Sequence, residues 1–211
     1  MNHSLRVTML IGIFVTWLSS ASISFSTPTT VKIQPRNEAF IIWALIFSSL
    51  VGSSYKIGDE SVFETQSAIL IITSIYLLVA WSFAVYKQKW WIAAVILVIT
   101  STLGWVSCYR YNLTNSIWGW VGLFSLGIFV GWLSVATALN VAIVYPKVDT
   151  PQTLFVISLI VSILSVMCKQ PFACLSIFWA IIMQKENTVW KLVSGILTVV
   201  FGYISYSRIN T

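Results

Sequence analysis

The chain has 211 residues, of which 58% are hydrophobic and only 9% are charged, and its mean hydropathy is +0.89. So few charged side chains cannot cover the surface of a soluble domain, which carries roughly 25% charged residues. The net charge of +6 comes from lysines and arginines scattered between apolar segments, without the basic runs that indicate nucleic-acid binding. The composition therefore predicts an all-α integral membrane protein that crosses the bilayer several times, with no nucleic-acid partner.

Eight apolar segments follow one another, and we predict that each forms one helix of a single bundle, because a backbone in lipid must satisfy its own hydrogen bonds. The fifth is longer than a hydrocarbon core of about 30 Å requires. The sixth and seventh are short and separated by Lys169-Gln170-Pro171, which predicts two short helices or one re-entrant hairpin; we favour two helices. The segments are 5–23, 38–55, 66–86, 90–109, 117–145, 153–168, 171–184 and 188–207.

The first segment has a second interpretation. Arg6, the apolar residues 7–18 and the small residues 19–22 resemble a cleavable signal peptide. We interpret the segment as the first membrane helix.

The lysines and arginines predict an orientation. With eight spans, the side of both termini receives five of them and the opposite side seven, so the positive-inside rule places both termini outside and the 24–37 loop inside. The five are Arg6, Lys56, Arg110, Lys169 and Arg208, and the seven are Lys32, Arg36, Lys87, Lys89, Lys147, Lys185 and Lys191.

The residues that carry most enzyme chemistry are scarce. The only histidine is His3, and no carboxylate lies in the interior of a predicted span, so the sequence predicts no metal site, catalytic triad, proton relay or enzymatic activity. Cys108, Cys168 and Cys174 have no metal-ligand spacing. A bridge between Cys108 and Cys168 is geometrically open, but we favour buried, small apolar cysteines.

The stretch 131–140, GWLSVATALN, places unusual residues inside an uncharged span. Trp132, Ala136 and Asn140 recur every fourth residue and therefore share one helix face. An indole can stack on a flat ring, alanine leaves room beside it, and an amide both donates and accepts a hydrogen bond. Such a face fits a pocket for a flat apolar molecule. Helix packing also explains it and is favoured by the spacing alone, because small residues let helices approach and a buried asparagine bonds a neighbouring helix.

Two further patterns concern helix faces. In the second segment, Phe40, Trp43 and Phe47 follow Pro35 and line one stripe. In the fifth, Gly127 and Gly131 form a G-x-x-x-G stripe suited to a close helix partner.

These motifs resemble one family. Residues 132–140 are similar to the fifth-helix signature W-x-x-x-A-T-x-L-N of the tryptophan-rich sensory protein (TspO, or translocator protein) family. Residues 35–47 resemble its second-helix pattern P-x-x-x-x-F-x-x-W-x-L-Y, with Phe47 in place of tyrosine, and Ala80-Trp81 falls where a third-helix Ala-Trp pair is expected. Residues 171–180 resemble the seventh helix of the longer members. The W-x-P-P stretch of the family's first loop is absent.

The resemblance implies a five-helix core at 1–145 with three further helices at 146–211. It also implies a cavity that binds a flat hydrophobic ligand, such as a porphyrin, a sterol-like molecule, a pigment or a lipid, without a covalent cofactor. The protein would then be a sensor or carrier, whose partners are the bilayer and a hydrophobic small molecule. The alternative is a non-catalytic accessory subunit of a larger membrane complex that holds pigments or transfers electrons. A homodimer is also open. The site residues implied are Phe40, Trp43, Phe47, Trp81, Trp132, Ala136 and Asn140.

Overall fold

The computed structural model describes residues 2–21, 39, 41–55, 65–111, 116–184 and 189–209. These residues form α-helices and one short 3-10 helix, and no strand occurs among them. The predicted helical bundle is confirmed, and the helix bounds lie within a few residues of the apolar segments. The elements are α1 (Asn2–Ala21), α2 (Ile42–Ser54), α3 (Thr65–Tyr86), α4 (Trp90–Tyr109), α5 (Ile117–Val144), the 3-10 helix η2 (Pro146–Val148), α6 (Pro151–Met167), α7 (Pro171–Ile182) and α8 (Val189–Ser207).

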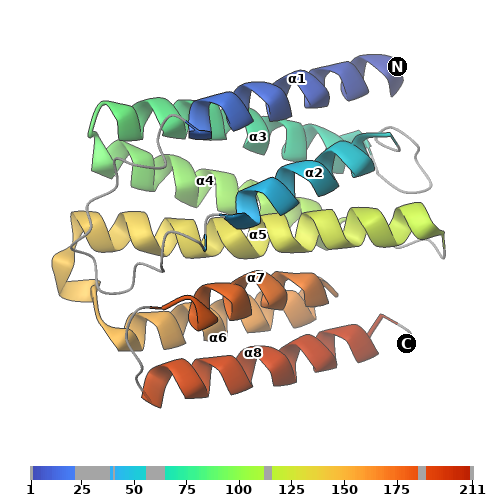
Figure 1. The fold of residues 1–211 in the computed structure, drawn as a ribbon. Helices are drawn as coiled ribbons and strands as arrows, with labels where there is room; N and C mark the ends of the chain where they lie inside the picture. The colour runs from blue at the N-terminus through green and yellow to red at the C-terminus, as the bar shows by residue number, and fades with distance from the viewer. Residues whose placement is uncertain are drawn as a thin grey trace.

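Consecutive helices run in opposite directions, so both ends of the chain lie at the same end of the bundle (Figure 1). This agrees with the predicted sorting of the basic residues that the structure describes. Arg6, Arg110, Lys169 and Arg208 fall at the end that holds the termini, and Lys87, Lys89, Lys147 and Lys191 fall at the other. Lys32, Arg36, Lys56, Lys185 and the 24–37 loop lie outside the described residues.

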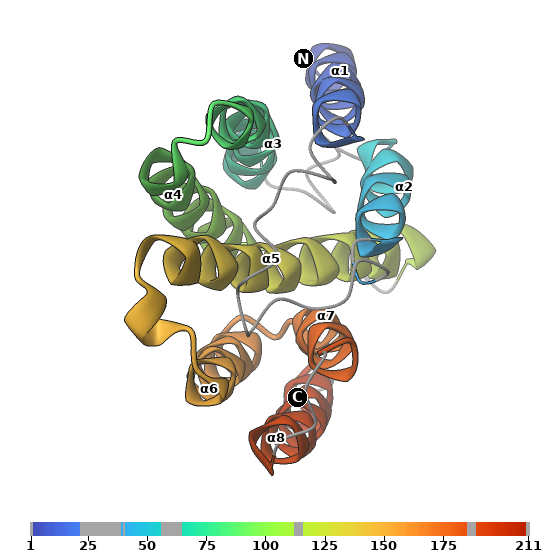
Figure 2. The same ribbon diagram turned by 60° about the vertical axis from the view of Figure 1, so that its left-hand side comes forward.

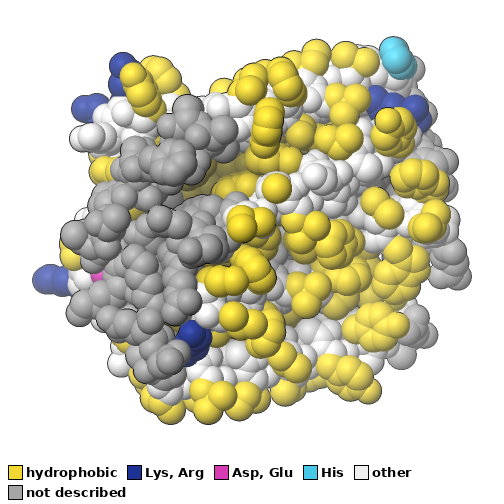
Figure 3. Space-filling model, in the orientation of Figure 1, with side chains coloured by type: hydrophobic (Ala, Val, Ile, Leu, Met, Phe, Trp, Pro, Cys, Tyr) yellow, Lys and Arg dark blue, Asp and Glu magenta, His cyan; other side chains and the backbone are white. Residues whose placement is uncertain are grey.

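Four of the described helices, α3, α4, α5 and α8, are long and apolar enough to cross a membrane. The others are shorter, and α7, with 12 residues, extends only about 18 Å at 1.5 Å per residue. On the face drawn in Figure 3, lysine and arginine atoms lie near the ends of the helices and hydrophobic atoms cover much of the band between them. The length of these four helices and the apolar band on this face are those of a membrane protein.

The helices form two groups that share α5 (Figure 2). On one side, α1 packs on α2 and α3, α3 on α4, α4 on α5, and α5 on α2, which closes a ring of five helices. On the other side, α7 packs on α5, and α6, α7 and α8 pack on one another. Each face of α5 therefore contacts a different set of helices.

The G-x-x-x-G stripe holds α7 close to α5. A Cβ atom added to Gly131 would lie 2.4 Å from the Ala173 carbonyl oxygen, and one added to Gly127 would lie 2.7 Å from the Phe172 Cβ. The Ser176 hydroxyl also donates to the Ile128 carbonyl at 2.7 Å. The helix partner predicted for this stripe is therefore α7 of the same chain.

The turn between α6 and α7 produces two separate helices, as favoured from the sequence. Lys169 adopts a positive φ of 51°, and Pro171 begins α7, where a missing N–H leaves no hydrogen bond unmade.

A hydrogen bond joins α8 to α6. Ser165, buried on α6, accepts it through its carbonyl from the Ser205 hydroxyl of α8 at 2.8 Å. Small side chains thus let α8 pack closely on α6.

Candidate functional site

Two of the predicted tryptophans meet inside the five-helix ring. Trp43 of α2 stacks on Phe47 with ring centroids 5.4 Å apart and meets Trp132 of α5 edge-on at 6.3 Å. Trp132 is only 1% exposed. The two indoles that the resemblance assigns to one cavity therefore lie together, and they contact each other.

A second contact from the predicted set joins α3 to α5. The indole N–H of Trp81 donates to Asn140 Oδ1 at 3.4 Å, and Asn140 Nδ2 donates to the Ala136 carbonyl at 3.0 Å. Asn140 therefore bonds a neighbouring helix, which is the packing role weighed for it. Phe40 lies outside the described residues. The contact of these residues with a ligand stays a prediction.

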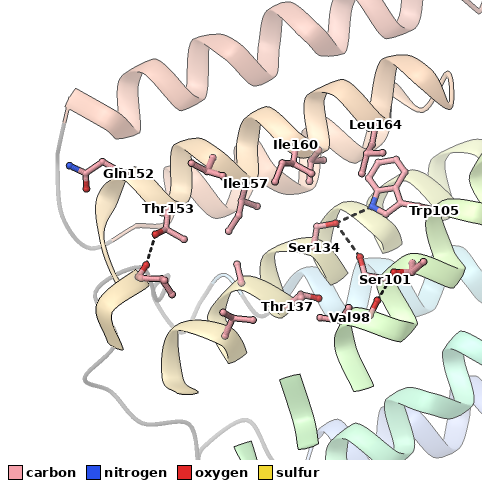
Figure 4. A pocket seen from close by; sticks show the side chains of 16 residues that line it. Val98, Ser101, Trp105, Ser134, Thr137, Gln152, Thr153, Ile157, Ile160 and Leu164 are labelled. Carbon is pink, nitrogen blue, oxygen red and sulfur yellow. Dashed lines mark hydrogen bonds between the residues drawn. The ribbon is translucent and has the colours of Figure 1, made fainter. Parts of the chain in front are cut away.

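A groove of about 590 Å³ lies on the opposite side of α5, between α4 and α6. This volume falls within the range of small-molecule sites, roughly 300–1,000 Å³. Figure 4 shows side chains of α6 facing those of α4 and α5 across it. The lining residues are Val98, Ser101, Thr102 and Trp105 of α4; Ser134, Thr137, Ala138 and Val141 of α5; and Val148, Gln152, Thr153, Val156, Ile157, Ile160, Val161 and Leu164 of η2 and α6.

A small polar cluster marks one end of the groove. The indole N–H of Trp105 donates to Ser134 Oγ at 3.1 Å, and the Ser101 and Ser134 hydroxyls lie 3.4 Å apart. Trp105 is buried, and Leu164 lies beside it in Figure 4. Next to this end, Cys168 Sγ lies 4.0 Å from the Trp105 carbonyl oxygen.

The other end of the groove lies where α6 begins. Gln152, which is exposed, and Thr153 lie there, next to the connection that contains Lys147 (Figure 4). The Thr153 hydroxyl donates to the Val148 carbonyl, which fixes η2 against the first turn of α6. The groove thus runs from a buried hydroxyl cluster to a polar opening at the end of the bundle.

The described lining of the groove is mostly apolar, with a few neutral polar groups. Among the described residues that line it, aliphatic side chains are combined with hydroxyls, one indole and one amide, and there is no carboxylate, lysine or histidine. These groups can enclose an apolar molecule and form hydrogen bonds with a polar group on it. They include no side chain that exchanges a proton near neutral pH.

This groove was not predicted from the sequence. Ser134 and Thr137 belong to the same stretch as Trp132, but they lie on the opposite face of the helix. Their polarity inside an apolar span could have indicated a polar site on that face. The groove between α4 and α6 could not be predicted from the sequence, because it depends on which helices pack on α5.

A comparison with protein-family models, with curated proteins and with solved structures finds no match for this chain.

Proposed function

We propose that this chain is a multi-pass integral membrane protein that binds a hydrophobic small molecule in the groove between α4, α5 and α6, as a carrier or sensor. The observation that supports this function is the groove itself, with its volume of about 590 Å³, its apolar walls and its single buried hydroxyl cluster. Apolar walls supply affinity by removing hydrocarbon from its surroundings, and a few placed polar groups set orientation.

The rim of the groove indicates how a ligand enters. Val98, Val156 and Ile160 line the groove and are also 48–50% exposed at the side of the bundle. An apolar side opening on a membrane-embedded helical bundle faces lipid. A hydrophobic molecule dissolved in the bilayer can therefore reach the groove without crossing water.

The proposed function agrees with that implied by the TspO resemblance but uses the other face of α5. Inside the ring, Trp43 contacts Trp132 and joins α2 to α5, and Trp81 bonds Asn140 and joins α3 to α5. We therefore assign the aromatic face of α5 a packing role in this proposal.

Co-purification tests the function. The protein is extracted with its surrounding lipid in polymer-bounded nanodiscs, repurified, and its organic extract is analysed by mass spectrometry. Ala138→Leu places a larger side chain in the groove, and Ala44→Leu makes the same change at an exposed position of α2. We expect wild type and Ala44→Leu to retain the same amount of one apolar molecule. Ala138→Leu should retain about one tenth of that amount or less, because a tenfold change in affinity corresponds to 1.4 kcal/mol.

Equal retention in all three proteins would contradict the assignment to the groove. If the purified chain retains no small molecule and a second membrane polypeptide co-purifies with it in stoichiometric amount, the accessory-subunit alternative is favoured.

A further inference from the structure

The hydroxyls of the groove have already used their hydrogens. Thr102 donates to the Val98 carbonyl at 2.8 Å, Ser134 to the Val130 carbonyl at 2.9 Å, and Thr137 to the Leu133 carbonyl at 2.8 Å. A carbonyl oxygen only accepts, so the hydrogen in each of these contacts belongs to the hydroxyl. Each hydroxyl therefore has only lone pairs left for any other partner.

The cluster at the buried end follows the same rule. Because Ser134 donates to its own helix, the hydrogen in its 3.4 Å contact with Ser101 belongs to Ser101. The Trp105 N–H also points to Ser134 Oγ, so that oxygen accepts two hydrogen bonds and is fully used. Ser101 retains two lone pairs, and it lines the groove.

The α4 and α5 side of the groove is therefore a surface of hydrogen-bond acceptors. Ser101, Thr102 and Thr137 lie there, and the indole N–H of Trp105 is occupied. Among the described lining residues, Gln152 alone has amide donors, and it lies at the opposite end. An acceptor on a ligand placed at the buried end would meet only other acceptors.

We infer that the molecule for this groove is an elongated apolar alcohol or phenol, whose O–H donates to Ser101 or Thr137. This inference rests on the proposed function and deepens it. From Gln152 to Leu164 the lining follows α6 for about 18 Å at 1.5 Å per residue, which suits an extended chain or a row of rings. A cationic ammonium would also donate, but no carboxylate among the lining residues compensates its charge.

Two isomers provide the test. Dodecanol and methyl undecyl ether contain the same atoms, and both carry an oxygen near one end, but only dodecanol has an O–H. Binding of each to the purified protein in detergent is measured from the concentration dependence of the melting temperature. We expect wild type to bind dodecanol about tenfold more tightly than the ether, the ratio for one buried hydrogen bond.

Matched variants show which side chains cause the preference for dodecanol over the ether. Thr137→Val is nearly isosteric and removes one acceptor, and Ser101→Ala removes another. In the double variant we expect the affinity ratio between the isomers to fall to about one, with the affinity for the ether unchanged. Thr73→Val removes a hydroxyl with the same backbone bond, 2.8 Å to the Ile69 carbonyl, at an exposed position of α3. This control should retain the wild-type ratio. If the double variant does not fold, Thr137→Val alone should reduce the ratio.

The outcomes separate the inference from the function. Saturable binding of both isomers with equal affinity would overturn the inference and leave the proposed function standing. Absence of saturable binding for either isomer would overturn both. A wild-type ratio that persists without the Ser101 and Thr137 hydroxyls would show that the donor is recognised elsewhere, which also overturns the inference.

Discussion

Ala136 and Ala138 lie on opposite sides of α5. Ala136 belongs to the buried core one helical turn from Trp132, whereas Ala138 lines the groove between α4 and α6. Two residues along an α-helix differ in direction by about 200°, so this separation follows directly from helix geometry. The same substitution at the two positions therefore tests packing on one face and binding on the other.

Ala136→Leu should destabilise the fold, and Ala138→Leu should not. Ala136 is 7% exposed among large side chains, so three added carbons overpack the core by about 1–3 kcal/mol. At position 138 the added carbons enter the groove. Thermal unfolding in detergent measures both effects. Equal melting temperatures for Ala136→Leu and wild type would show free space beside Trp132, as a ligand pocket inside the ring requires.

Gly131→Ala should weaken the contact between α5 and α7. Its Cβ would lie 2.4 Å from the Ala173 carbonyl oxygen, a backbone atom that moves only with the helix, so we expect a loss of about 1–3 kcal/mol. Gly52→Ala is the matched control, because its Cβ would meet Val121 Cγ1 at 3.7 Å, an ordinary contact. The control should be neutral or stabilising by up to about 1 kcal/mol. Denaturant unfolding checks both, and a stable Gly131→Ala would contradict the tight α5–α7 packing.

The hydrogen bond between Trp81 and Asn140 should contribute modestly to the stability of the fold. A double-mutant cycle with Trp81→Phe and Asn140→Ala should give a coupling energy of roughly 0.6 kcal/mol, the average for interhelical hydrogen bonds in membranes. Dodecanol affinity should remain unchanged in both single variants, because neither residue lines the groove. A loss of affinity with unchanged stability would instead assign Asn140 to a ligand.

Both ends of the chain should be accessible from the same side of the membrane. Single cysteines at the exposed positions Ser4 and Ser207 should react with an impermeant reagent on one side, and a cysteine at Lys147 should react on the other. Sealed vesicles of known orientation, with all native cysteines replaced, provide the measurement. Labelling of Ser4→Cys and Ser207→Cys from opposite sides would contradict the eight-crossing arrangement.

Hydropathy alone determined the helices of this protein. A backbone in an apolar environment must bond to itself, so long uncharged segments become helices whatever their neighbours are. The span 90–109 was predicted with the bounds that α4 has, and Pro171 marks the start of α7. Helix period also placed Trp132, Ala136 and Asn140 on one face.

Only the tertiary structure decided what lies against each face. The helix period shows that Ser134 and Thr137 are opposite Trp132, but it does not indicate that α4 and α6 flank them and leave a groove. The glycine stripe likewise indicates a close helix partner, and the fold identifies that partner as α7. Packing depends on contacts between residues far apart in the chain, such as Trp105 with Ser134, and local periodicity contains no information about such pairs.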